Sequence, residues 1–130
     1  MRSIVRRRIA LSIVAGLAAA LAVVPGLSLA EPSPTAAQEI DLLIQRVESM
    51  TTRTFIRNGS ESSADEAARH LRDKYGYFRS EIRTAEDFIR LCGTRSEMTK
   101  KPYLVKTGSA VQPSAEVLTE ELRHIRRPKQ

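Results

Sequence analysis

The clearest structural signals in this 130-residue sequence lie in Thr54-Phe55-Ile56-Arg57-Asn58-Gly59-Ser60 and in the six residues that follow, Glu61-Ser62-Ser63-Ala64-Asp65-Glu66. Two apolar residues precede Asn58-Gly59, a dipeptide that readily adopts positive φ and so turns the chain. Ser63 and Glu66 have the spacing of a capping box, which satisfies backbone N–H groups at the start of a helix. The stretch therefore predicts a short strand over residues 54–57, a turn, and a helix that begins at Ser63.

Apolar residues at helical spacing occur on both sides of this stretch. Upstream, Ile40, Leu43, Ile44 and Val47 lie at i, i+3, i+4 and i+7, one face of a helix. Downstream, Thr84 provides a fresh N-cap, and Gly93 is expected to end that helix at the C′ position. Pro128 stops the last helix. We predict four helices, over residues 35–50, 63–82, 84–92 and 114–127.

A second short extended run, Tyr103-Leu104-Val105, lies between Pro102 and Gly108-Ser109. Two extended runs in a helical chain favour pairing with each other, and a lone ribbon needs helices to pack against because it is marginally stable. We therefore expect a mainly α fold of four short helices with a two-stranded antiparallel β-ribbon, a small α+β domain.

The first thirty residues have the pattern of a secretory signal peptide. Four arginines precede an uncharged apolar run over residues 9–24, Pro25-Gly26 follows, and Ser28-Leu29-Ala30 fits a cleavage site after Ala30. The alternative is an uncleaved anchor, but the run is shorter than the roughly 20 residues of a membrane span. We expect a signal peptide (1–30), a Pro/Ser linker (31–34), one small helical domain (35–127) and a basic tail (128–130), in a protein exported to the periplasm or secreted.

The net charge of the mature chain indicates which classes of binding partner to expect. Residues 1–30 hold four of the 21 Lys and Arg and none of the 15 acids, so the mature chain carries a net charge of +2 rather than +6. Because most of the excess lies in the signal peptide, no nucleic acid partner is expected. A local basic group could make weak contact with an anionic membrane surface. It consists of Arg123, Arg126, Arg127 and Lys129.

Five blocks of the sequence, in order, carry a family resemblance: residues 54–60, 67–75, 84–89, 101–105 and 113–116. In this order they resemble the YfeK-like family of small exported bacterial proteins, a domain of unknown function, and the resemblance covers nearly all of the mature chain. The resemblance implies an exported, single-domain, periplasmic protein, and it supplies no activity.

No catalytic or metal-binding group of residues stands out. Cys92 lies on an apolar helical stripe, which favours a buried and inert thiol over a disulfide between two copies. His70 and His124 lie on different helices without further ligands at metal-binding spacing, so neither a metal nor a cofactor is expected. The serines occupy caps and turns, and no nucleophile-elbow glycines frame them. A small envelope hydrolase is therefore the least favoured function.

The candidate binding residues surround the Asn-Gly turn. Arg57 and Asn58 precede a helix start, His70 and Lys74 lie one turn apart on that helix, and Tyr103 comes from the second extended run. These five residues could line one polar pocket for an anion or a glycan. Alternatively, Arg57 braces the turn, and His70 and Lys74 are ordinary surface residues. We expect a non-enzymatic interaction or binding module with an envelope protein as partner, and keep a small ligand near Arg57, His70 and Lys74 as the alternative.

Overall fold

A computed structural model describes residues 34–128 of the chain. The expected signal peptide, its cleavage site after Ala30, most of the linker and Lys129 lie outside the described residues. No helix within the described residues is long and apolar enough to cross a membrane.

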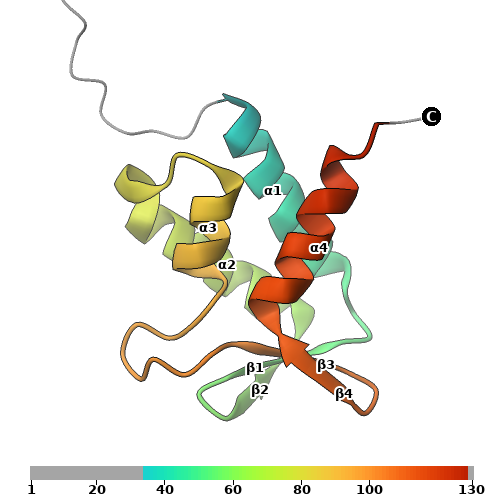
Figure 1. The fold of residues 1–130 in the computed structure, drawn as a ribbon. Helices are drawn as coiled ribbons and strands as arrows, with labels where there is room; N and C mark the ends of the chain where they lie inside the picture. The colour runs from blue at the N-terminus through green and yellow to red at the C-terminus, as the bar shows by residue number, and fades with distance from the viewer. Residues whose placement is uncertain (1–33, 129–130) are drawn as a thin grey trace, which may run out of the picture.

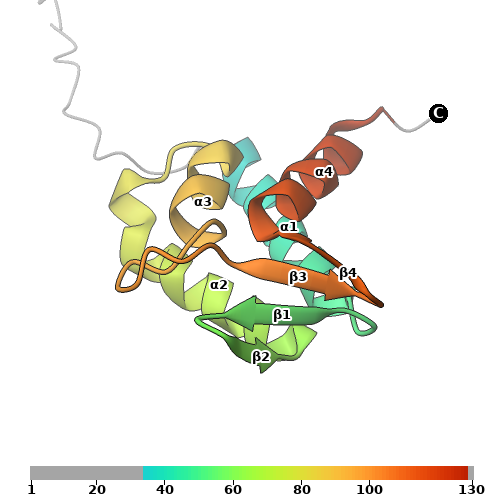
Figure 2. The same cartoon turned by 60° about the horizontal axis from the view of Figure 1, so that its bottom comes forward.

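Four helices pack on one face of a four-stranded antiparallel sheet (Figures 1 and 2). Two hairpins, β1–β2 and β3–β4, meet along β1 and β3, which gives the strand order β2-β1-β3-β4. The elements are α1 (Pro34–Ser49), β1 (Thr54–Arg57), β2 (Ser60–Ser62), α2 (Ala64–Phe78), the 3-10 turn η1 (Arg79–Glu81), α3 (Ala85–Cys92), β3 (Leu104–Thr107), β4 (Ala110–Pro113) and α4 (Ser114–Arg126).

The expected pairing of the two extended runs is confirmed, with Phe55 opposite Val105. The expectation of only two strands is wrong, because each central strand continues through a tight turn into a partner. Asn58 and Gly59 both have positive φ, which matches the twist of a two-residue hairpin, and Gly108 has positive φ in the second turn. The two added strands escaped prediction because β2 reads Ser-Glu-Ser and all four residues of β4 are exposed.

The predicted helix starts are confirmed in detail. Ser63 and Glu66 form a complete capping box at α2, and Thr84 and Asp87 form another at α3. Each cap satisfies backbone N–H groups that the helix itself cannot pair. These two boxes fix where α2 and α3 begin.

Gly93 ends α3, but it does not adopt the left-handed conformation expected of a C′ glycine, since its φ is −109°. Its role is spatial: a Cβ at Gly93 would lie 2.3 Å from Cδ1 of Leu118 on α4. The glycine lets α3 and α4 approach closely.

The core lies between the helices and the inner face of the sheet. Phe88, Ile40, Leu43, Ile82 and Leu118 are its largest fully buried side chains. Because successive strand side chains alternate between faces, the burial of Phe55 in β1 and Val105 in β3 identifies the inner face of both strands. This alternation also positions the candidate site.

Candidate functional site

Arg57 and Tyr103 lie on the inner face of the sheet, just beyond the apolar core. Arg57 is two residues after Phe55 and Tyr103 is two residues before Val105, so both share the face of those buried residues. The register pairs Ile56 with Leu104, and one more step places Arg57 opposite Tyr103. The end of the central strand pair thus presents a guanidinium and a phenol toward α2.

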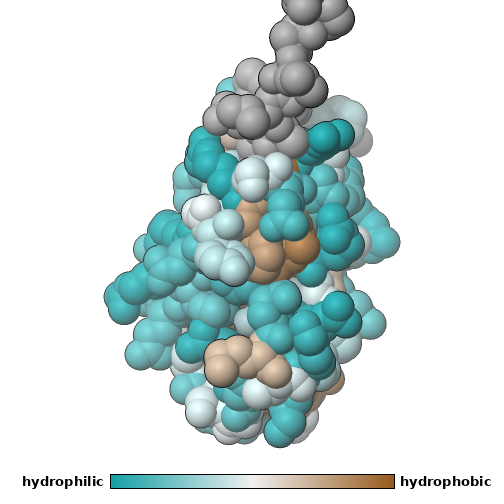
Figure 3. Space-filling view, turned by 90° about the vertical axis from the view of Figure 1, so that its left-hand side faces the viewer, coloured by the Kyte–Doolittle hydropathy of each residue, from teal (hydrophilic) through white to brown (hydrophobic). Residues whose placement is uncertain are grey.

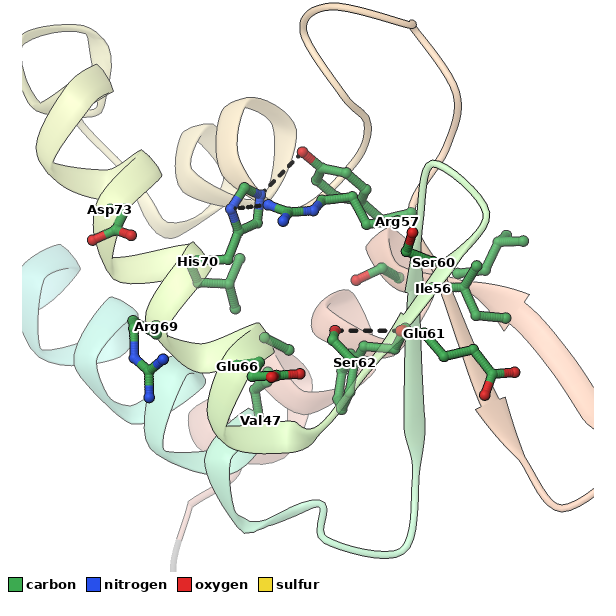
Figure 4. A pocket seen from close by; sticks show the side chains of 16 residues that line it. Val47, Ile56, Arg57, Ser60, Glu61, Ser62, Glu66, Arg69, His70 and Asp73 are labelled. Atoms are coloured by element: carbon green, nitrogen blue, oxygen red, sulfur yellow. Dashed lines mark hydrogen bonds between the residues drawn. The ribbon is translucent and has the colours of Figure 1, made fainter.

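His70 of α2 joins these two side chains (Figure 4). Its Nδ1 is hydrogen-bonded to Nη1 of Arg57, and its Nε2 lies 3.1 Å from the hydroxyl oxygen of Tyr103. The rings of His70 and Tyr103 meet edge to face with their centroids 5.6 Å apart. One imidazole therefore links α2 to both central strands.

The charges around it set the protonation of this imidazole. Burial, together with the charges of Arg57 and Lys74, lowers the pKa of His70 to about 4. The ring is thus neutral at neutral pH. Because Arg57 can only donate, Nδ1 of His70 accepts and the ring proton lies on Nε2, which donates to Tyr103.

Lys74 lies one helical turn beyond His70 and is almost fully buried, with 9% of its surface exposed. Its Nζ donates to the carbonyl oxygen of Arg95 at 3.1 Å and to the hydroxyl of Tyr103 at 3.3 Å. Glu97 is the nearest carboxylate, at 3.9 Å. Burial lowers the pKa of Lys74 even though Glu97 acts to raise it. The ammonium is thus held by neutral groups more than by an acid.

These bonds give the Tyr103 hydroxyl a defined direction. Its oxygen accepts one hydrogen bond from His70 and one from Lys74, since both partners act as donors. Burial raises the pKa of Tyr103, so the phenol keeps its own proton. That proton is left to donate to a further group.

Asn58 fastens the β1–β2 turn to the loop between α3 and β3. Its amide nitrogen lies 3.4 Å from Oγ of Ser96, and its Oδ1 accepts a hydrogen bond from Thr99. This loop, residues 93–103, also supplies the carbonyl of Arg95 and the carboxylate of Glu97 that face Lys74. No periodic pattern in residues 93–101 of the sequence marks this role.

Two pockets lie on either side of the Arg57, His70 and Tyr103 side chains. The first, of about 480 Å³, lies between α2 and the β1–β2 hairpin, and we name it the hairpin pocket (Figure 4). The second, of about 620 Å³, lies between α2, the Asn-Gly turn and the 93–103 loop, and we name it the loop pocket. The loop pocket is lined by Arg57, Asn58, Ser60, His70, Lys74, Tyr77, Phe78, Ser96, Glu97, Met98 and Tyr103.

The two pockets differ in charge. Two arginines and three acids line the hairpin pocket, which gives it an excess of negative charge. In the loop pocket Arg57 and Lys74 face a single acid, Glu97, and within residues 34–128 no carboxylate lies within ion-pair distance of Arg57. All five residues predicted to bind a ligand line this second pocket.

The family of unknown function DUF5329 matches residues 34–126 of this chain, nearly the whole of the described part. The chain belongs to this family. The uncharacterized protein YfeK of Salmonella typhimurium strain LT2 is 48% identical to it over 50 residues, which cover 38% of this chain and 42% of YfeK. The match thus spans less than half of the relative's length. No solved structure matches the chain. The YfeK-like resemblance is confirmed, and neither name carries an activity.

Two of the C-terminal cations of this DUF5329 chain form ion pairs. Arg126 on α4 binds Glu39 on α1 and Glu86 on α3 at once. Arg123 pairs with Glu120 on its own helix. The proposed membrane contact is therefore left mainly to Arg127 and to Lys129, which lies outside the described residues.

The single cysteine and the histidines take no catalytic arrangement within residues 34–128. Cys92 is fully buried, and burial raises the pKa of its thiol to about 12. His70 contacts Arg57 and Tyr103, whereas a hydrolase of the Ser-His-Asp type would place a serine and an acid on it. His124 lies on α4 beside Glu120.

Proposed function

We propose that this protein is an exported binding module that holds a small anionic ligand in the loop pocket. The observation that carries the proposal is the convergence of Arg57, Lys74 and the Tyr103 hydroxyl on one pocket that holds a single acid. The arginine-rich N-terminus and the apolar run over residues 9–24 support export.

Charge and burial favour an anion over a neutral ligand. Lys74 has lost most of its hydration, and Glu97, 3.9 Å away and half exposed, compensates it only in part. A carboxylate or phosphate placed between Lys74 and Arg57 would complete that compensation. In a partly dry pocket such charge-assisted hydrogen bonds are stronger than those between neutral groups.

The hydrogen-bond directions favour the same class of ligand. Arg57 uses one nitrogen on His70 and retains the other donors of its fork, and the Tyr103 proton is free to donate. These donors fit the several lone pairs of a carboxylate or phosphate. Both nitrogens of His70 are already bonded, so it positions the donors rather than acting as a base.

The test is ligand-induced stabilisation of the purified protein. Acetate and phosphate, compared with chloride at constant ionic strength, should raise Tm, because a ligand at 100 times its Kd stabilises the folded state by about 2.7 kcal/mol. Arg57→Ala and Lys74→Met should each abolish most of the rise.

Arg69→Ala is the matched control, since Arg69 is an exposed arginine of α2 that lines the hairpin pocket instead. It removes the same charge and should leave the rise intact. The proposal is wrong if neither anion raises Tm, or if Arg69→Ala reduces the rise as much as Arg57→Ala does.

A further inference from the structure

The lining of the loop pocket also includes exposed apolar side chains. Tyr77 at the end of α2 is 80% exposed and Met98 in the 93–103 loop is 94% exposed. Seen from the side of this loop, the surface is mostly hydrophilic and its hydrophobic areas are small (Figure 3). Single exposed apolar residues are common, but these two line the same pocket as Arg57 and Lys74.

The ring of Tyr77 offers a flat surface for a ligand. It meets the ring of Phe78 edge to face at 4.8 Å between centroids. That contact leaves most of the Tyr77 ring in solvent. An aromatic ring in this position suits a ligand with a flat, weakly polar face.

Aromatic acids and sugar acids both have such a face, and the hydrogen-bonding groups in the rest of the pocket lining favour one of them. Glu97 can only accept hydrogen bonds, and the amide of Asn58 and the hydroxyl of Ser60 can donate or accept them. An aromatic acid would carry a carboxylate and a ring but nothing for these groups to bind. A sugar acid has a carboxylate, a ring face of C–H groups and several hydroxyls.

We propose that the anion held in the loop pocket is the carboxylate of a monosaccharide acid. The carboxylate binds Arg57 and Lys74, the sugar ring lies on Tyr77, and hydroxyls bind Glu97 and Asn58. The volume of about 620 Å³ lies within the range of small-molecule sites. This inference rests on the proposed function, because it assigns the class of ligand to the same pocket.

The test compares three ligands by titration calorimetry: glucuronate, acetate and glucose. Wild-type protein should bind glucuronate about tenfold more tightly than acetate, and glucose more weakly than either, because only glucuronate contacts both the cations and the Tyr77 ring. Tyr77→Ala should reduce the affinity for glucuronate, so that its advantage over acetate becomes smaller, and leave acetate binding unchanged. Tyr77→Phe keeps the ring and should bind glucuronate as wild type does.

The outcomes separate this inference from the proposed function. If acetate binds through Arg57 but glucuronate binds no more tightly, or if Tyr77→Ala leaves the difference in place, the sugar acid is wrong and the anion site stands. If glucose binds as tightly as glucuronate, the carboxylate is not the anchor and the inference is overturned. If no anion binds, both fall together.

Discussion

Lys74 lies at an apolar position of its helix, although lysine side chains are usually exposed. Its place between Leu71 and Phe78 lies on the apolar stripe of α2, yet a lysine at such a position is usually read as a surface residue. In the structure it is buried, and its ammonium lies 5.1 Å from the centroid of the Tyr103 ring and 5.7 Å from that of Phe78. The alternative of an ordinary surface residue is therefore wrong for Lys74, whose long stem packs as an apolar side chain does.

The shifted pKa of His70 predicts a pH dependence of stability. The unfolded chain binds a proton near pH 6.5, whereas the folded protein binds it only near pH 4. Between these pH values, unfolding is therefore accompanied by the uptake of a proton on His70. The contribution of His70 to the free energy of unfolding is fully present above pH 6.5 and is lost as the pH falls toward 4. Because His70 keeps some solvent contact, we expect a loss of roughly 1–2 kcal/mol rather than the ~3 kcal/mol of the full shift.

Urea unfolding at pH 7 and pH 5 would measure this loss. His70→Gln cannot titrate and should show a smaller difference between the two pH values than the wild type. An equal difference in both proteins would show that His70 is not the group responsible.

At the scale of elements, the caps and stripes of the helices could be predicted and the outer strands could not. Ser63 with Glu66 and Thr84 with Asp87 are local signals, since a capping box is complete within four residues. The strand β2 has no buried residue, and its formation depends on the neighbouring strand β1. The Asn-Gly turn was the one local indication of a hairpin. It would have predicted β2 only if the polar residues after the turn had been recognised as a strand.

Two glycines provide a matched test of the helix packing. Gly93→Ala places a Cβ against Leu118, where α3 meets α4, and should destabilise the protein by about 1–3 kcal/mol. Gly76→Ala places a Cβ in open space on α2 and should stabilise it by up to about 1 kcal/mol through helix propensity. Chemical denaturation measures both. A stabilising Gly93→Ala would contradict the close approach of the two helices.

At the scale of the whole molecule, the chain topology brings the site residues together from separate elements. Arg57 comes from β1, His70 and Lys74 from α2, and Tyr103 lies just before β3. These four residues and Asn58 could be selected from the sequence, because Arg57 and Asn58 lie at the turn, His70 and Lys74 lie one turn apart on the helix that follows, and Tyr103 belongs to the second extended run. The sequence did not predict Ser96 and Glu97, since their place beside Lys74 depends on the path of an irregular loop.

At the same scale, Arg126 takes part in the contacts between helices. Arg126 connects α4 to both α1 and α3 through Glu39 and Glu86, and these carboxylates raise its pKa. An arginine held in this way helps to orient three helices. The loop pocket, by contrast, has a cation, Arg57, with no carboxylate of residues 34–128 within ion-pair distance.

The most direct test of the anion site is a nuclear magnetic resonance titration with acetate that follows the side-chain nitrogen of Arg57 and the backbone amides of residues 57–60 and 93–103. We expect saturable shifts there, with a single Kd, while the side chain of Arg69 stays unchanged. Shifts that are linear in acetate, or that appear equally at Arg57 and Arg69, would contradict a binding site in the loop pocket.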